Sequence, residues 1–255
     1  MPQHEIKAVL FDLGDTLLNF GRVRTTGIFI KGARRSYDYL KTQGQPTGPF
    51  LWYCVRNLVR LRLVQLRYGL AGKDFDALTY LEGVGRKEGV QLTPEQWEEF
   101  AWLWYEPLSQ LADIESDLRE TLTALRQLGL KLGVVSNTFV NRASLERHLR
   151  SIGVLDLFSE LLFSCEYEFR KPHLALFRIA AEKVGEALEN TLFVGDRIDK
   201  DIRPALATGM RAALKDAYTN RGRENPPGAW RIQRIAELPA LIEQANAGIT
   251  SGTCA

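Results

Sequence analysis

The chain has 255 residues, of which 45% are hydrophobic and 25% charged, and its formal net charge is +2; this composition is typical of a globular protein with one large domain or two smaller ones. The three cysteines, Cys54, Cys165 and Cys254, are scattered without metal-ligand spacing, so the sequence indicates neither a disulfide framework nor a zinc site. No run approaches the roughly 18 apolar residues of a membrane span, and the N-terminus lacks a secretion signal, so we expect a cytoplasmic protein without a membrane partner.

The first predicted element is a strand from Ile6 to Phe11. Its apolar residues are continuous apart from Lys7, which is typical of a strand that is buried on both faces. A loop with the sequence Asp-Leu-Gly-Asp-Thr, residues 12 to 16, follows it directly. This loop carries the first polar side chains after the strand.

The segment from Leu18 to Ala112 reads as helical and contains no convincing strand. Phe50 to Tyr68 forms one candidate helix. Thr93 is a good helix start, because Pro94 follows at the first helical position and Gln96 completes a capping box. The sequence therefore predicts an all-helical domain at residues 18–112.

The first half of this helical domain is strongly basic. Between Gly21 and Arg67, ten residues are Lys or Arg and only Asp38 is acidic. We expect the segment to attract anions, which hints at a multiply anionic substrate. For its arginines a solvated helix face is favoured over a nucleic-acid site, so no nucleic-acid partner is expected.

After the helical segment, strands and helices alternate. The strand pattern recurs at residues 130–135, 192–194 and 210–214, and each strand follows an amphipathic helix that is closed by a glycine: Gly129, Gly185 or Gly209. This alternation predicts an α/β fold, a Rossmann-like, doubly wound parallel sheet. We place this core domain at residues 1–17 and 113–245 and expect a flexible tail at 246–255.

Polar side chains follow the predicted strands. Asp12 ends the first, Ser136 with Asn137 ends the second, Lys171 follows the region 161–164, and the loop 195–201 follows the strand at 192–194. In doubly wound sheets, ligands bind outside the carboxyl ends of the strands. We therefore expect these side chains to converge on one rim of the sheet.

A set of carboxylates, a hydroxyl and an ammonium group suits phosphoryl transfer. Aspartates at neighbouring strand ends can hold Mg²⁺, which prefers a few carboxylates, waters and phosphate oxygens. A carboxylate can also act as the nucleophile and form an acyl phosphate that water then removes. The lysine and the hydroxyl can stabilise the charge on the phosphoryl oxygens.

Four segments, in order, resemble the motifs of the haloacid dehalogenase-like superfamily. They read FDLGDTL, KLGVVSN, RKPHLALF and FVGDRIDKDIRPALATGM, and together they frame residues 6 to about 214. The resemblance implies a hydrolase in which the helical domain at residues 18–112 is a mobile cap that closes over the substrate. Such a cap excludes water and supplies specificity.

The resemblance also assigns roles to the residues at the strand ends. Asp12 would be the nucleophile and a metal ligand, and Asp196 would be a second metal ligand. Lys171 would neutralise the phosphate, and Ser136 would hold its oxygens. Asp201 would bind a metal-bound water or orient Lys171.

Four further residues receive supporting roles from the same resemblance. Thr16 would support the loop after the first strand. Gly14 would give its backbone carbonyl to the metal, and Gly14, Asp15 and Asn137 would lie on the substrate side of the site.

The first motif departs from the pattern of most phosphatases of this family. These carry a second aspartate, the general acid and base, at the position that Gly14 occupies here. Asp15 comes one residue later, and neighbours along an extended loop point to opposite sides, so it is not a simple replacement. General acid or base help contributes roughly 10²- to 10⁴-fold in rate, so its loss slows a phosphatase without removing its nucleophile.

Other branches of the family carry other residues at this position, which leaves alternatives open. Dehalogenases have tyrosine there, but a metal-independent dehalogenase does not need the Gly-Asp-x4-Asp pattern of residues 195–201. A phosphonatase would require a Schiff-base lysine from the cap. The candidates for it are Lys31, Lys41, Lys73 and Lys87. A third alternative is a catalytically weakened member that binds or regulates.

The sequence thus favours a Mg²⁺-dependent phosphatase that hydrolyses a small phosphorylated metabolite through an aspartyl-phosphate on Asp12. We expect it to act as a monomer or a homodimer.

Overall fold

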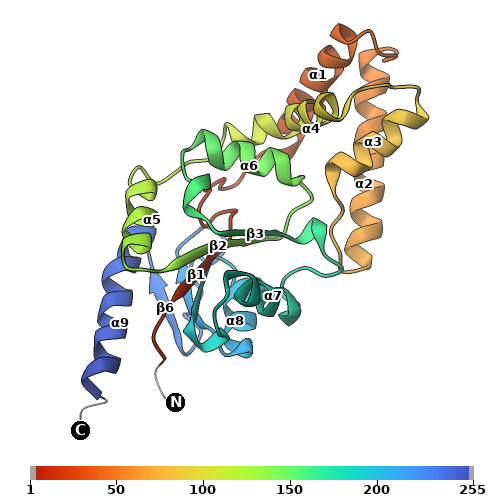
Figure 1. Cartoon of the computed structure of the whole chain (residues 1–255). Coiled ribbons are helices and arrows are strands. Elements are labelled where there is room, and N and C mark those ends of the chain that lie inside the picture. Colours follow the sequence, from red (N-terminus) through yellow and green to blue (C-terminus); the bar gives the residue numbers. More distant parts are fainter. Residues whose placement is uncertain (1–3, 253–255) are drawn as a thin grey trace.

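The computed structural model describes residues 4–252 and contains one parallel sheet of six strands (Figure 1). The strand order is β3-β2-β1-β4-β5-β6, and every neighbouring pair is parallel. The strands are β1 (Ala8–Phe11), β2 (Lys131–Ser136), β3 (Glu160–Phe163), β4 (Thr191–Gly195), β5 (Arg211–Lys215) and β6 (Ala229–Ile232). The α/β fold with a doubly wound parallel sheet is therefore confirmed.

Helices cover both faces of the sheet. Alternate residues of β1 face opposite sides: Val9 and Phe11 pack with α5 (Leu118–Gln127), α6 (Arg142–Ser151) and α9 (Leu238–Gly252). Ala8 and Leu10 pack on the other side. The helices there are α7 (Leu174–Val184) and α8 (Arg203–Thr208). All four residues of β1 are fully buried, which explains their continuous apolar run.

All three predicted helix ends adopt the backbone conformation that favours glycine. Gly129 after α5 has φ of 81°, Gly185 after α7 has φ of 70°, and Gly209 after α8 has φ of 93°. In this left-handed region a side chain is disfavoured, and the chain turns back toward the next strand.

The strand β6 was not predicted. It lies at the edge of the sheet, and only Ile232 of its four residues is buried. A half-exposed edge strand lacks the continuous apolar run by which the buried strands were recognised.

A helical insert separates β1 from α5. It consists of α1 (Thr25–Thr42), α2 (Phe50–Leu70), α3 (Ala77–Lys87) and α4 (Pro94–Ser109), and Figure 1 shows it projecting from the sheet domain. The insert has its own apolar core, which includes Tyr37, Tyr53, Trp97 and Phe100. The predicted start of α4 is confirmed, because Thr93 and Gln96 form the capping box.

The two connections between the insert and the sheet domain run side by side. The Asn19 N–H donates to the Asp113 carbonyl (3.0 Å), and the Asp113 N–H donates to the Asn19 carbonyl (2.8 Å). The predicted domain boundaries at 18 and 112 fall beside this bridge.

The insert also touches the sheet domain through the loop between α2 and α3. Asp74 accepts hydrogen bonds from the Ser164 hydroxyl (2.6 Å) and from Arg170 (2.8 Å). The Phe75 ring stacks on Phe139, with 5.3 Å between the ring centroids. These contacts hold one edge of the insert against the loops after β2 and β3.

The end of the chain differs from the flexible tail expected at 246–255. Helix α9 continues to Gly252, and Asn246 is tied to Ile6: its Oδ1 accepts from the Ile6 N–H (2.8 Å) and its Nδ2 donates to the Ile6 carbonyl (3.1 Å). This pair of hydrogen bonds to the segment before β1 anchors the helix. Residues 253–255, and with them Cys254, lie outside the described residues.

Cys54 and Cys165 are free and half-buried. Within residues 4–252, no helix combines the length and the apolar character that crossing a bilayer requires.

A buried histidine joins the insert to the sheet domain and should make stability depend on pH. The Tyr105 hydroxyl of α4 lies 2.9 Å from His148 Nδ1 of α6, and burial lowers the pKa of His148 to about 4. In the unfolded chain this pKa is about 6.5, so as the pH falls the unfolded state binds the proton first and stability is lost below that value.

We expect the free energy of unfolding to fall by about 2 kcal/mol more in the wild type than in His148→Gln between pH 7.5 and 5.0. Urea unfolding at the two pH values measures this difference. Equal pH dependence of the two proteins would show that His148 takes up its proton in the folded state.

Candidate active site

The centre of the site is the ammonium group of Lys171. Its Nζ lies 2.6 Å from Asp12 Oδ1, 2.7 Å from Asp201 Oδ1 and 2.8 Å from the Val135 carbonyl oxygen. The side chain is only 2% exposed. Burial by itself lowers the pKa of Lys171, but the two carboxylates outweigh it and raise the pKa above its ordinary value. The ammonium group is therefore charged at neutral pH.

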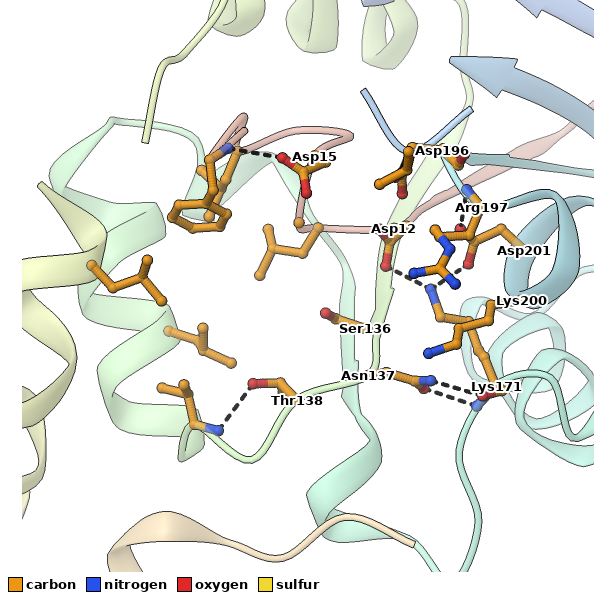
Figure 2. Close-up of a pocket in the computed structure, with 18 of the residues that line it drawn as sticks. Asp12, Asp15, Ser136, Asn137, Thr138, Lys171, Asp196, Arg197, Lys200 and Asp201 are labelled. Atoms are coloured by element: carbon orange, nitrogen blue, oxygen red, sulfur yellow. Dashed lines mark hydrogen bonds and ion pairs between the residues drawn. The ribbon is translucent and has the colours of Figure 1, made fainter. Parts of the chain in front are cut away.

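Asn137 holds the backbone of Lys171. Its Oδ1 accepts from the Lys171 N–H (2.8 Å) and its Nδ2 donates to the Lys171 carbonyl (2.7 Å) (Figure 2). The loop after β2 thereby fixes the start of the segment that leads into α7. The Asn137 amide therefore has a positioning contact, and the residue also lines the cavity beside Asp12, on the side where a substrate is expected.

Three buried carboxylates meet beside Lys171. Ligand atoms of Asp12, Asp196 and Asp201 lie within 4.8 Å of one another. Burial, together with the negative charge of Asp12, raises the pKa of Asp196; burial also raises the pKa of Asp201, although Lys171 opposes it. A second positive charge at this cluster would relieve the repulsion. The set of hard oxygen donors fits Mg²⁺.

The turn after β4 places Asp201 against the sheet. A Cβ atom added to Gly195 would lie 2.5 Å from the Asp201 Cβ, so only glycine allows this approach. Asp201 Oδ2 accepts from the Arg197 N–H (2.9 Å), which leaves Oδ1 directed at Lys171. Asp201 is therefore in direct contact with Lys171.

The loop after β1 uses Asp15 to shape its own turn. Asp15 has φ of 59°, and its Oδ1 accepts from the N–H groups of Phe20 and Gly21, both at 2.9 Å. Figure 2 shows Asp15 standing apart from the group around Asp12. The Thr16 hydroxyl, by contrast, lies 3.4 Å from Asp12 Oδ2. Asp15 lines the cavity, and its Oδ1 is engaged in the turn.

Gly14 leaves an open space on the wall of the site. An added Cβ atom would meet no atom within 4 Å, and the backbone there does not have positive φ. Gly14 lines the cavity beside Asp12. A side chain at this position would therefore point into free volume without backbone strain.

A cavity of about 320 Å³ opens over these residues. Its polar end contains Asp12, Ser136, Lys171, Asp196 and Asp201. About half of the remaining lining residues are apolar or aromatic, and they come from both the sheet domain and the insert. They include Leu13, Leu18, Phe20, Tyr105, Leu108, Phe139, Val140 and Leu145. The cavity thus joins a charged end to an apolar chamber.

The cavity residues without a role assigned from the sequence include Arg197, Lys200, Tyr218 and Thr219. The Thr219 hydroxyl donates to the Asp196 carboxylate and lies 3.3 Å from the Asp196 carbonyl. Thr219 and Tyr218 belong to the loop after β5. Ligands bind outside the carboxyl ends of the strands, so this loop also could have been predicted to contribute site residues. Arg197 pairs with Asp199, whereas Lys200 makes no ion pair with any described residue.

The basic segment lies away from the cavity. None of its ten Lys and Arg residues lines the cavity, and Arg56 and Arg60 both pair with Glu88. Of the four insert lysines considered as Schiff-base candidates, none lines it either. The cations of the site come instead from the loops after β3 and β4.

A model of the haloacid dehalogenase-like hydrolase family matches residues 6–209. Glyceraldehyde 3-phosphate phosphatase of Methanocaldococcus jannaschii is 38% identical over 126 residues, which are 49% of this chain and 54% of that protein. The chain thus spans about half the length of this curated relative. Human (Homo sapiens) N-acylneuraminate-9-phosphatase is 22% identical, over 97% of this chain and 98% of that protein.

Solved structures share the fold. The crystal structure of a HAD (haloacid dehalogenase) phosphatase from Thermococcus onnurineus has a TM-score of 0.58 at 22% identity, over 93% of this chain and 98% of that one. A 2-haloacid dehalogenase from Pseudomonas syringae pv. Tomato DC3000 has a TM-score of 0.61 at 22% identity, over 94% and 99% of the two chains. The same architecture therefore occurs in proteins named for two different reactions.

Removing the central ammonium group should destabilise the fold. Lys171→Met leaves Asp12 and Asp201 buried without their counter-charge, and we expect the free energy of unfolding at pH 7.5 to fall by about 3 to 5 kcal/mol. Urea unfolding without divalent cations measures the loss. Lys131→Met is the matched control, because Lys131 is 44% exposed in its pair with Glu186 and should lose less than about 1 kcal/mol. Similar small losses in both variants would contradict the central role of Lys171.

Proposed function

This chain belongs to the haloacid dehalogenase-like hydrolases, and we propose that it is a phosphatase acting on a small phosphomonoester. The observation that carries the proposal is the placement of Lys171 between Asp12 and Asp201 at the carboxyl ends of the strands. The names of the phosphatase relatives support the same reaction class. A charged lysine beside a carboxylate nucleophile suits a substrate that brings negative charge.

In the proposed reaction, a carboxylate oxygen of Asp12 attacks the phosphorus atom. The bond from phosphorus to the ester oxygen breaks, the ester oxygen leaves as the anion of the alcohol and takes a proton from solvent, and an acyl phosphate remains on Asp12. Water then attacks that phosphorus, which releases inorganic phosphate and restores the carboxylate. Lys171 and the Ser136 hydroxyl stabilise the charge on the phosphoryl oxygens.

The buried carboxylates support a magnesium site. Asp12, Asp196 and the backbone carbonyl of Gly14 would hold the ion, because Asp12 and Asp196 are crowded together and are deprived of water. Bound Mg²⁺ would supply positive charge against the phosphoryl oxygens. The Thr219 hydroxyl orients the Asp196 carboxylate for this purpose.

The helical insert, residues 18–112, is proposed to be a cap over the core domain formed by residues 1–17 and 113–245. Tyr105 and Leu108 of α4, and Phe20 in the connection before α1, line the cavity opposite Asp12. The cap therefore supplies part of the wall that would contact the leaving group.

The apolar wall and Gly14 together indicate the class of leaving group. No carboxylic acid stands at position 14 to protonate the departing oxygen, and Asp15 is engaged with Phe20 and Gly21. An alcohol that leaves as a stable anion needs little protonation. A phenol is such an alcohol, because its phenolate anion is stable. We therefore propose an ester of an apolar, aromatic alcohol. The basic segment, which hinted at a multiply anionic substrate, does not line the cavity.

A panel of phosphate esters tests this function. We expect Mg²⁺-dependent turnover of aryl phosphates such as 4-nitrophenyl phosphate, slower turnover of alkyl phosphates, and no turnover by Asp12→Asn, which lacks the nucleophile. Beryllofluoride with Mg²⁺ should raise the melting temperature of the wild type but not of Asp12→Asn. Absence of both turnover and beryllofluoride stabilisation would instead support a member that has lost catalysis.

Restoring the acid at position 14 should change the dependence on leaving group. Because the space beside Gly14 is open, Gly14→Asp is expected to raise kcat/KM for alkyl phosphates by about 10² and to change that for aryl phosphates much less. Gly14→Asn is the matched control, since it has the same size but no acidic proton to give. An unchanged alkyl rate in Gly14→Asp, or an equal gain in Gly14→Asn, would show that another group already moves the proton.

A further inference from the structure

Helix α2 exposes a continuous apolar face. Six of its large side chains, named here the α2 stripe, are between 45% and 82% exposed. They are Trp52, Val55, Val59, Leu63, Leu66 and Leu70. Their spacing of three or four residues places them on one side of the helix. The opposite side carries Tyr53 and Val64, which are buried against the rest of the insert.

The stripe is too large to be an ordinary feature of a monomer surface. With the neighbouring Leu51, which is 75% exposed, it presents roughly 700 Å² of apolar surface, whereas the largest patch on a monomer is typically about 300 to 600 Å². A standard interface buries about 800 Å² on each partner. The stripe therefore has the area that a stable dimer needs.

The positions of the stripe are nearly symmetric along the helix. Trp52 and Leu70 both lie nine residues from Leu61, while Val59 and Leu63 lie two residues from it. A second copy that runs antiparallel therefore places Trp52 beside the partner's Leu70, and Val59 beside the partner's Leu63. This is the self-complementarity that a twofold interface requires.

We propose that the α2 stripe is the interface of a homodimer in which two α2 helices pack antiparallel across a twofold axis. Gly69, next to Leu70, supports this register. A Cβ atom added to it would meet nothing within 4 Å, so the surface beside Leu70 has room for the large ring of the partner's Trp52. Figure 1 shows α2 on the outer side of the insert, away from α5 and α9, where a second copy can approach.

The charges on α2 suggest how the dimer responds to salt. The helix has four arginines and no acidic residue. Arg56 and Arg60 are neutralised by Glu88, but Arg62 and Arg67 make no ion pair with a described residue and flank the stripe. In the antiparallel pair, Arg62 and the partner's Arg62 lie on the same side of the seam, two residues apart in register. Salt screens this repulsion, so the dimer should tighten as the salt concentration rises.

An anionic lipid surface is the alternative partner for the α2 stripe, because such surfaces bind basic amphipathic helices. Two free arginines offer little attraction of this kind, at about 1 kcal/mol each. A lipid surface also makes no use of the near-symmetric spacing of the stripe. Binding to lipid would weaken with salt, which is the opposite of the response expected for the dimer.

Sedimentation equilibrium of the full chain at 1 to 50 µM tests the proposal. We expect a wild-type dimer whose dissociation constant falls at least threefold between 50 and 500 mM NaCl, and a monomer for Val59→Glu with Leu63→Glu. Gln127→Glu, at an exposed site at the end of α5, is the matched control and should remain a dimer. A monomeric wild type, or a dimer that survives the double substitution, would overturn the proposal.

Disulfide trapping tests the register independently. With the native cysteines replaced by serine, a mixture of Trp52→Cys and Leu70→Cys chains should give a cross-linked heterodimer, and each variant alone should give none. Cross-links in the single variants would indicate a parallel pair and contradict the antiparallel one. Salt-sensitive sedimentation with phosphatidylserine vesicles, by a chain that stays monomeric, would assign the stripe to a lipid surface.

Discussion

The structure of the site depends on one buried ammonium group. Lys171 sits between Asp12 and Asp201 and is almost inaccessible to water. Burying several charges is costly unless they compensate one another, so the loops after β1, β3 and β4 must hold their positions together. Asn137, Gly195 and the Arg197 N–H supply that precision through short contacts. The excess negative charge that remains is what makes the cluster suited to a divalent cation.

The cavity over this cluster combines two chemical environments. Its floor is polar because the strand ends supply charged groups, and part of its wall is apolar because loops of the sheet domain and helix α4 of the insert contribute apolar side chains. Gly14 lies on that wall and adds no acid to it. The proposed preference for a good leaving group follows from this arrangement. The apolar outer face of α2 lies on another part of the insert, so self-association and catalysis use different surfaces.

Much of the fold could be predicted from the sequence because buried parallel strands have continuous apolar runs, as β1 does, and because glycine closes the helices before them. The order of the motifs also placed Asp12, Lys171 and Asp196 near one another. The edge strand β6 was not predicted from the sequence, because its residues are half-exposed and form no continuous apolar run. The helix at residues 246–252 was not predicted because Asn246 binds Ile6, a contact between segments far apart in the chain.

The sequence by itself determined the α/β architecture, the helical insert and the set of groups at the strand ends, because these follow from local periodicity and from the parallel order of the strands. Only the tertiary structure decided where individual side chains point. In the folded chain, the Asp15 carboxylate accepts a hydrogen bond within its own turn, Asn137 binds the backbone of Lys171, and the Thr219 hydroxyl donates to Asp196. These choices depend on contacts between segments far apart in the chain, such as Asp12 and Lys171, which are 159 residues apart. Local spacing carries no information about such contacts.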